Sequence, residues 1–215
     1  MLPASVLHWL ARLPSERPVA MLLRHAARPP IPPGETGNEL ALTREGVTEA
    51  RHLGGLLGRR LVSLHTSPVL RCLQTAEALR EGARVPLDIL SDRMLGAPGA
   101  FVVDEVLGGQ TLQQLGLESF VAHLIAGEGV LPGVAEPSAA ASSLVRHMLE
   151  HVGDVQGLHV FVTHDSLVAP TVARMLQCPV PPEDWPEYLE AAFFWREGPE
   201  VWGAYRTRSS VCLGR

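Results

Sequence analysis

The chain of 215 residues has the length of one large domain or two small ones, and its 46% hydrophobic and 19% charged residues exclude a disordered protein. A formal net charge of −5 argues against a nucleic-acid or anionic-membrane partner, because such partners select a basic excess or stripe. All 18 basic residues are arginine, and the absence of lysine excludes mechanisms that need a P-loop lysine, a Schiff-base lysine or a lysine general base.

The cysteines and the first residues indicate a cytoplasmic protein. Cys72, Cys178 and Cys212 are widely spaced and form no C-x-x-C pair, which is typical of reduced thiols rather than of a disulfide framework or a zinc site. The first residues lack the basic stretch that precedes the apolar core of a signal peptide, and no apolar run approaches the ~18 residues of a membrane span. We therefore expect a cytoplasmic location and no membrane partner.

The first third of the chain predicts helices that alternate with short buried strands. A short amphipathic helix is expected near the N-terminus, followed by a buried strand in the apolar run at 19–23. Thr43 is placed to cap the next helix, and residues 61–66 form a second predicted strand. Ser67 and Pro68 then have the residue types that begin a helix.

The middle of the chain is less regular than its ends. Glycines and prolines break residues 85–137 into loops around one weak helix near 112–125, and we interpret this segment as an insertion that covers the substrate. The regular elements expected after it are a helix over 137–151, a strand over 158–162, a helix after Asp165, and strands over 192–195 and 201–205. Pro170 is expected to start its helix or to lie in the first turn, because an interior proline costs about 3 kcal/mol.

This order of elements predicts the fold class. Strands that alternate with helices are typical of an α/β fold with a mainly parallel central sheet flanked by helices. We expect a single domain over residues 1–215, with the loop-rich insertion lying over the active site. In open sheets of this class, ligands bind beyond the carboxyl ends of the strands.

Polar side chains gather at the ends of three predicted strands. They are Arg24, His25 and Arg28 after the first strand, Ser67 and Arg71 after the second, and Thr163, His164 and Asp165 after a later one. Three arginine forks can neutralise a dianionic phosphoryl group and hold its oxygens during in-line transfer. One neutral imidazole can attack phosphorus to give a phosphohistidine, the other can donate a hydrogen bond, and Asp165 can protonate the leaving oxygen without any metal.

Four segments of the sequence carry a family resemblance. They are Arg24-His25-Ala26, the run from Leu42 to Gly46, the run from Ser67 to Glu77, and Thr163-His164-Asp165. Their order over about residues 19–176 resembles the histidine phosphatase (phosphoglycerate-mutase-like) superfamily. The resemblance implies an α/β sandwich, a phosphorylated small-molecule substrate, no cofactor, and His25 as the phosphorylated nucleophile. It also implies that Arg24, Arg71 and His164 complete the phosphate pocket.

The motifs are mixed between the two branches of this family. The Ser-Pro-x-x-Arg-x-x-Gln-Thr-Ala run resembles branch 1, the mutases and small phosphatases. The Arg-His-x-x-Arg-x-Pro run and the His-Asp pair resemble branch 2, the acid phosphatases and phytases, which implies that Arg28 also holds phosphate and that Asp165 is the proton donor. Branch 1 usually has its acid in a Glu-Gly pair after the second helix, and residues 84–105 contain no such pair, so Asp104 and Glu105 are alternative donors. Ala26 replaces the usual glycine, which matters if φ is positive there.

Other interpretations stay open beside the phosphatase. A non-catalytic member of the family would bind a phosphorylated ligand through the same residues. Residues 147–151 match the H-x-x-E-H motif of a zinc peptidase, and His164-Asp165 matches the centre of an HD-type metal hydrolase, although both need further ligands. The favoured prediction is a metal-independent phosphatase that acts on a phosphomonoester or a phosphoprotein. We expect the insertion and the proline-rich loop at 29–34 to select the substrate, and no motif indicates which substrate or oligomeric state.

Overall fold

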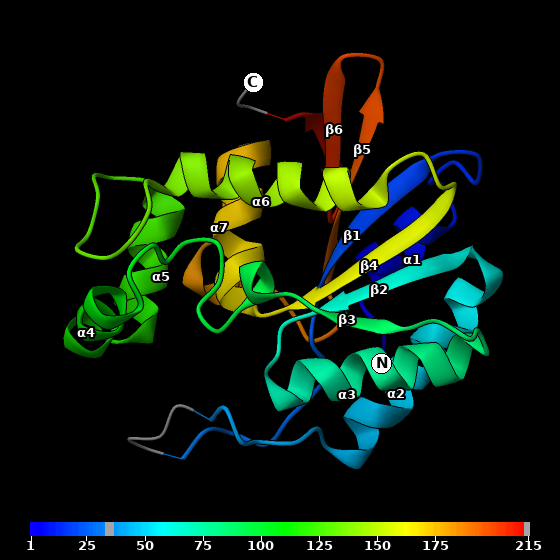
Figure 1. Cartoon of the computed structure of the whole chain (residues 1–215), viewed down its shortest axis with the longest axis horizontal. Helices are drawn as coiled ribbons and strands as arrows, with labels where there is room; N and C mark the ends of the chain where they lie inside the picture. The colour runs from blue at the N-terminus through cyan, green and yellow to red at the C-terminus, as the bar shows by residue number, and fades with distance from the viewer. Residues whose placement is uncertain (33–36, 213–215) are drawn as a thin grey trace.

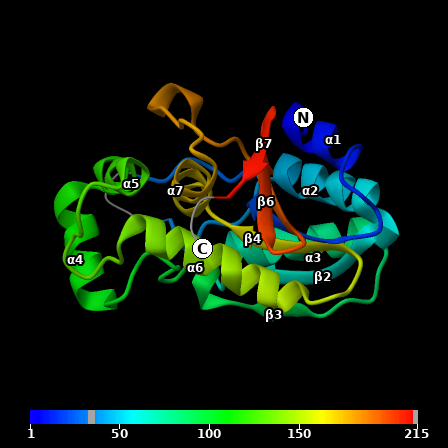
Figure 2. The ribbon, with the colours of Figure 1, turned by 90° about the horizontal axis from the view of Figure 1, so that it is seen from above.

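A mixed sheet runs through the centre of the molecule, with helices on both of its faces (Figure 1, Figure 2). The computed structural model describes residues 1–32 and 37–212, and within them the sheet has seven strands in the order β3-β2-β4-β1-β5-β6-β7. The strands are β1 (Pro18–Arg24), β2 (Leu61–Thr66), β3 (Ile89–Ser91), β4 (Gly157–Thr163), β5 (Ala191–Glu197), β6 (Glu200–Tyr205) and β7 (Arg208–Val211). The helices are α1 (Ala4–Leu10), α2 (Arg44–Leu57), α3 (Leu70–Ala83), α4 (Glu105–Leu115), α5 (Leu117–Ala126), α6 (Pro137–Val152) and α7 (Asp165–Leu176).

The inner strands of the sheet are parallel. β3, β2, β4 and β1 run in one direction, and β5, β6 and β7 follow as antiparallel neighbours. The predicted α/β fold with a mainly parallel central sheet flanked by helices is therefore confirmed for the inner strands. Because β1, β2 and β4 are parallel, their carboxyl ends meet at one edge of the sheet. The start of β5 lies at the same edge, since β5 pairs Ala191 with Leu23 in antiparallel register.

Alternate residues of β1 pack into two cores, one on each face of the sheet. Ala20 and Leu22 join the core made with α5, α6 and α7, whereas Val19, Met21 and Leu23 join the core made with α1, α2 and α3. Both faces of this strand are covered, which explains why its sequence is a continuous apolar run rather than an alternating pattern. Of the helices in the described part of the chain, none is both long and apolar enough to cross a membrane.

Glycines allow α2 and α3 to approach to backbone contact. A Cβ atom at Gly54 would lie 2.1 Å from the carbonyl oxygen of Leu79, and one at Gly82 would lie 1.9 Å from the carbonyl oxygen of Arg51. No side chain fits at such distances, because the interior is already close-packed. This contact positions α3, whose first turn carries Arg71.

Two predicted helix starts are wrong. α3 begins at Leu70 after Val69 rather than at Ser67 and Pro68, because the Ser67 hydroxyl is engaged with a histidine at the sheet edge. Pro170 lies at the sixth position of α7 rather than in its first turn. The proline ring is buried with the apolar face of the helix, and this packing offsets the hydrogen bond that proline cannot donate.

The middle segment contains more helix than the sequence pattern predicts. Two helices, α4 and α5, replace the single helix expected near 112–125, and Gly116 separates them with a φ of 75°. The edge strands β3 and β7 are absent from the prediction, because three or four residues show no readable period.

Candidate functional site

The predicted site residues meet at the carboxyl edge of the sheet. Arg24 ends β1 and Thr163 ends β4, and the two residues are register partners in the parallel ladder. The residue that follows each strand is a histidine, so the pairing of the strands places His25 beside His164. Their ring centroids lie 5.5 Å apart at an interplanar angle of 68°. Both side chains are buried, with His25 2% exposed and His164 6% exposed.

The hydrogen bonds of His25 define its tautomer. Its Nδ1–H donates to the carbonyl oxygen of Ala26 at 2.8 Å, and its Nε2 accepts from Nε of Arg71 at 3.1 Å. Since a guanidinium only donates, Nε2 carries the lone pair. Burial, followed by the neighbouring His164, lowers the pKa of His25 to about 2. The ring is therefore neutral near pH 7, with an unprotonated Nε2.

Arg71 joins the two histidines through one guanidinium. Its Nη2 donates to Nδ1 of His164 at 3.1 Å, and its Nη1 donates to the carbonyl oxygen of Gly37 at 2.8 Å. With Nδ1 of His164 as an acceptor, Nε2–H donates to the Ser67 hydroxyl oxygen at 3.1 Å. Burial, and next the charge of Arg71, lowers the pKa of His164 to about 3. Two neutral imidazoles thus flank a buried cation.

Arg24 is held from several directions. Its Nη2 forms an ion pair with Oδ2 of Asp165 at 2.6 Å, and its Nη1 donates to the carbonyl oxygen of Pro186. The guanidinium carbon lies 4.2 Å from the centroid of the Tyr188 ring, within cation–π distance. Its Nε is buried without a hydrogen-bond partner among the described residues. The other Asp165 oxygen accepts from the backbone N–H of Ser166 at 2.8 Å.

Arg28 lies beside this cluster and is half-buried. Its Nη1 donates to the carbonyl oxygen of Pro29 at 2.8 Å, and its Nε is buried with no hydrogen-bond partner in the part of the chain that the structure describes. Burial, with a smaller contribution from the charge of Arg28, lowers the pKa values of Arg24, Arg71 and His164. Pro33 and Gly34, the end of the predicted proline-rich loop, lie outside the described residues.

Ala26 fits the backbone without strain. Its φ is not positive, so the position does not require the glycine that the family usually has. Its N–H donates to the Thr75 hydroxyl oxygen at 3.0 Å, and that hydroxyl donates to the carbonyl oxygen of Arg71 at 2.7 Å. The backbone next to His25 is thereby tied to the first turns of α3.

Leu95 and Gly96 of the middle segment lie against Thr163 and His164. Gly96 has a φ of 144°, and a Cβ atom there would lie 2.7 Å from both Nε2 of His164 and Oγ of Ser67. The Thr163 hydroxyl donates to the carbonyl oxygen of Leu95 at 2.6 Å. The Cys72 sulfur also contacts His164, at 3.6 Å from its Nε2. Burial raises the pKa of the Cys72 thiol to about 12. The thiol is therefore uncharged near pH 7.

The alternative proton donors have partners of their own. The Asp104 carboxylate caps α4 by accepting from the backbone N–H groups of Val106 and Leu107, each at 3.0 Å. Glu105 forms an exposed ion pair with Arg93 at 2.5 Å. Within the described residues, neither carboxylate forms a hydrogen bond or ion pair with the residues gathered around His25.

The H-x-x-E-H motif has a different setting. His147 and His151 share a face of α6 with ring centroids 4.3 Å apart, and Nε2 of His147 contacts Oδ2 of Asp92 at 2.7 Å. Across residues 1–32 and 37–212, no three His, Cys, Asp or Glu side chains are grouped so that they could hold a metal ion. The zinc-peptidase and HD-type interpretations therefore gain no support from the arrangement.

Sequence reasoning missed the residues that precede β5. Tyr188 packs on Arg24, and its ring centroid lies 5.7 Å from that of His25. Residues that follow strands share one edge only where the strands are parallel. β5 is antiparallel, so its start reaches the same edge as the end of β1. The signal available was the short Pro-Glu-Tyr-Leu-Glu segment just before the strand.

Comparisons with known proteins point to one family. Residues 21–94 match the sequence profile of the histidine phosphatase superfamily (branch 1), whereas comparison with curated proteins gave no match. The matched segment includes the branch 1-like run from Ser67 to Glu77.

Solved structures share the fold at low sequence identity. A mutant phosphoserine phosphatase of Entamoeba histolytica, solved with phosphoserine, aligns at a TM-score of 0.57 and 12% identity, covering 88% of this chain and 96% of that chain. A mycobacterial glucosyl-3-phosphoglycerate phosphatase with inorganic phosphate aligns at 0.53 and 19% identity, covering 83% and 89%. The phosphoglycerate mutase of Bacillus anthracis aligns at 0.53 and 13% identity, covering 92% and 93%. The sequence match therefore relates residues 21–94 to the histidine phosphatase superfamily, and the solved structures show that the chain shares the phosphoglycerate-mutase-like fold.

Proposed function

We propose that the protein is a metal-independent phosphatase that hydrolyses a phosphomonoester through a phosphohistidine at His25. The observation that carries this proposal is the unprotonated Nε2 of a buried, neutral His25, held by a hydrogen bond from Arg71. An imidazole nitrogen in this state is a nucleophile toward phosphorus, and the arginine beside it stabilises charge on the oxygens being transferred.

Arginine donors that lack a protein partner support a phosphate pocket around His25. The Nε atoms of Arg24 and Arg28 are both buried and unpartnered among the described residues, although a buried N–H normally has an acceptor. Phosphate oxygens would satisfy them, and Arg71 would add a third cation. His164 would donate to the phosphoryl group once its Nε2–H turns from Ser67 to an incoming oxygen.

Asp165 is the proposed proton donor, and Arg24 links its role to phosphate binding. In the free protein, Asp165 is the ion-pair partner of Arg24. A bound phosphate would take over Nε and Nη2 of Arg24, and the released Asp165 carboxyl, once it has taken a proton from solvent, would protonate the leaving oxygen. As the P–O bond breaks, a P–N bond forms at His25. A water activated by Asp165 then hydrolyses the P–N bond and restores the imidazole.

The middle segment, residues 85–137, is the proposed substrate cover. Its support is the contact of Leu95 and Gly96 with the end of β4 and with His164. Several solved structures of the same fold are phosphatases of small phosphorylated molecules by name, and they favour a substrate of this class. We propose a cytoplasmic enzyme on the cysteine pattern described above.

Substitution of His25 tests the nucleophile. His25→Ala should abolish hydrolysis of p-nitrophenyl phosphate, with a loss of about 10³-fold or more, because the proposed P–N bond forms at this residue. The acid-labile phosphoenzyme formed from labelled substrate should vanish with it. His52→Ala, which removes an exposed histidine of α2, should leave both signals at the wild-type level.

A chelator and vanadate complete the test. Turnover should persist in a chelator and be inhibited by vanadate, which adopts the geometry of the transferring phosphoryl group. Activity that a chelator abolishes and zinc restores would contradict the proposal. A wild-type protein that binds phosphate but turns over no member of a broad phosphomonoester panel would be a phosphate-binding protein instead.

A further inference from the structure

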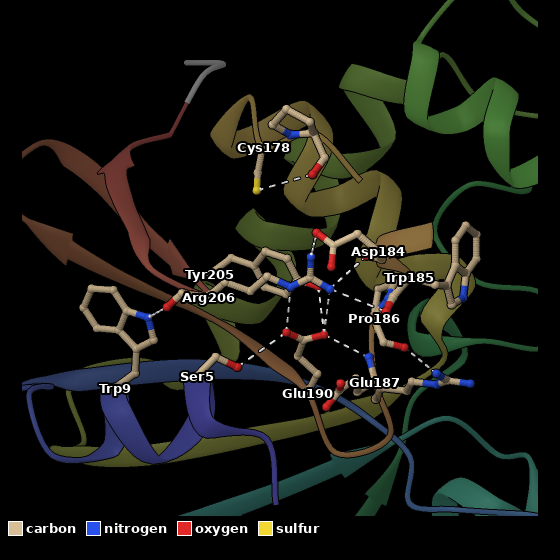
Figure 3. A network of polar contacts seen from close by, with 12 residues as sticks. Ser5, Trp9, Cys178, Asp184, Trp185, Pro186, Glu187, Glu190, Tyr205 and Arg206 are labelled. Carbon is tan, nitrogen blue, oxygen red and sulfur yellow. Dashed lines mark hydrogen bonds and ion pairs between the residues drawn. The ribbon is translucent and has the colours of Figure 1, made fainter. Parts of the chain in front are cut away.

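A buried ion pair joins Glu190 to Arg206, outside the group of residues proposed to bind phosphate (Figure 3). Arg206 donates to the carboxylate of Glu190 through Nε at 2.9 Å and through Nη2 at 3.2 Å. The Glu190 side chain is only 4% exposed, and the Tyr205 hydroxyl donates to it at 3.1 Å. Burial, and next the charge of Glu190, raises the pKa of Tyr205, so this hydroxyl keeps its proton. A carboxylate this deeply buried requires such donors, because an unpaired buried charge is strongly destabilising.

The ion pair fastens the loop that precedes β5, residues 184–190. Arg206 donates to the carbonyl oxygen of Asp184 at 2.8 Å and also contacts its carboxylate (Figure 3). Glu190 accepts from the backbone N–H of Glu187 at 2.9 Å. The two charged side chains therefore hold loop 184–190 at its beginning, middle and end.

Loop 184–190 presents three groups to Arg24. The carbonyl oxygen of Pro186 accepts from Nη1, and the ring of Tyr188 lies against the guanidinium face. The backbone N–H of Arg24 donates to the carbonyl oxygen of Glu190 at 2.9 Å. Arg24 is thus fixed at its backbone, at one terminal nitrogen and at one face by a loop that is itself tied to Arg206.

We propose that the Glu190–Arg206 pair is a positioning device for the phosphate pocket, which holds loop 184–190 so that Nε and Nη2 of Arg24 are presented to phosphate. The inference rests on the proposed function for the identity of the ligand. Glu190, Arg206 and Tyr188 act through Arg24 and are positioning residues. Their loss weakens anion binding only while Arg24 is present, which separates this role from a general contribution to folding.

A double-mutant cycle tests this dependence in the full chain. Calorimetry would measure binding of vanadate and of inorganic phosphate to wild type, Arg206→Met, Arg24→Gln and the double variant. We expect Arg206→Met to weaken binding roughly tenfold, and the double variant to bind no more weakly than Arg24→Gln alone, because coupled residues are non-additive. Arg208→Met, which removes an exposed arginine of β7, should bind both anions as wild type does.

Tyr188 provides a second test that leaves the buried ion pair intact. Tyr188→Leu should weaken binding severalfold in the wild-type background and not in the Arg24→Gln background. Tyr188→Phe, which keeps the ring against Arg24, should restore most of it. If thermal melting shows that Arg206→Met does not fold, these two Tyr188 variants test whether loop 184–190 positions Arg24.

Two outcomes distinguish failure of the positioning role from failure of the proposed function. Binding that is unchanged in Arg206→Met and Tyr188→Leu, or losses of equal size with and without Arg24, would overturn the positioning role and leave the phosphate pocket standing. A wild-type protein that binds neither anion would overturn the proposed function, and the positioning role with it.

Discussion

At Arg24, a carboxylate, a backbone carbonyl and an aromatic ring all contact a single guanidinium. Only a planar side chain with several fixed donors can make these contacts at once and still have an Nε with no partner among the described residues. A lysine side chain has one nitrogen and no planar group, so it could make only one of these three contacts. The choice of arginine therefore has a physical meaning at this position, whatever the cause of its use elsewhere in the chain.

Asp165 carries a prediction at the same scale. Asp165→Asn keeps the shape of the side chain but removes the transferable proton, so the loss should depend on the leaving group. We expect a loss of roughly 10²-fold or more for an alkyl phosphate, and one at least about tenfold smaller for p-nitrophenyl phosphate, whose leaving group needs little protonation. Steady-state kcat/KM for the two substrates measures this difference. Equal losses for both would reject Asp165 as the acid and leave it only as the partner of Arg24.

The side chains at the strand ends were predictable from the sequence, whereas their partners were not. Arg24, His25 and His164 follow apolar runs that end at one sheet edge, and a rule about parallel sheets is enough to bring them together. Ser67 has the residue type of a helix cap, yet its hydroxyl faces His164 instead. Tyr188 lies near the site because it precedes the antiparallel strand β5, and an apolar run in the sequence does not reveal the direction of its strand.

At the scale of elements, α2 and α3 pack closely because glycines lie where their backbones meet. Gly54 and Gly55 are neighbours in α2, but a Cβ atom would clash with the backbone of α3 only at Gly54. Periodicity identified both helices, since it depends on the apolar face. It does not show which glycines lie at a close contact, because that depends on the partner helix.

The two neighbouring glycines provide a matched pair for a stability measurement. A Cβ atom at Gly54 would lie 2.1 Å from a carbonyl oxygen, and one at Gly55 would meet nothing closer than 3.7 Å. Gly54→Ala should lower the free energy of unfolding by roughly 1–3 kcal/mol or more, because the helices must separate. Gly55→Ala should raise it by roughly 0.5–1 kcal/mol through helix propensity. Urea denaturation checks both, and similar effects of the two substitutions would contradict the close contact.

At the scale of the whole molecule, the histidines at the site make stability depend on pH. His25 and His164 have pKa values of about 2 and about 3 in the folded protein, against an ordinary value near 6.5. Between the low pKa values of the folded protein and the ordinary value near 6.5, these two histidines bind protons in the unfolded chain but not in the folded chain. Their contribution to stability is therefore complete above about pH 6.5 and is lost as the pH falls.

The slope of this loss gives a measurement. Each histidine accounts for at most ~1.4 kcal/mol per pH unit, so His164→Gln should make the pH dependence between pH 6 and pH 4 shallower by up to that amount. Urea denaturation followed by tryptophan fluorescence at several pH values provides the data. His52→Gln, at an exposed position, should keep the wild-type slope. An unchanged slope in His164→Gln would mean that His164 titrates normally in the folded state.

The order of the sheet has a consequence for how the chain folds as it is synthesised. β1 is made first among the strands, yet it lies between β4 and β5, which come late in the sequence (Figure 1). Its apolar run stays unpaired on the ribosome until Gly157–Thr163 has been made, and pairings so distant in sequence close slowly. This segment is therefore open to aggregation during synthesis, and we expect the proposed phosphate pocket to be among the last parts of the molecule to form.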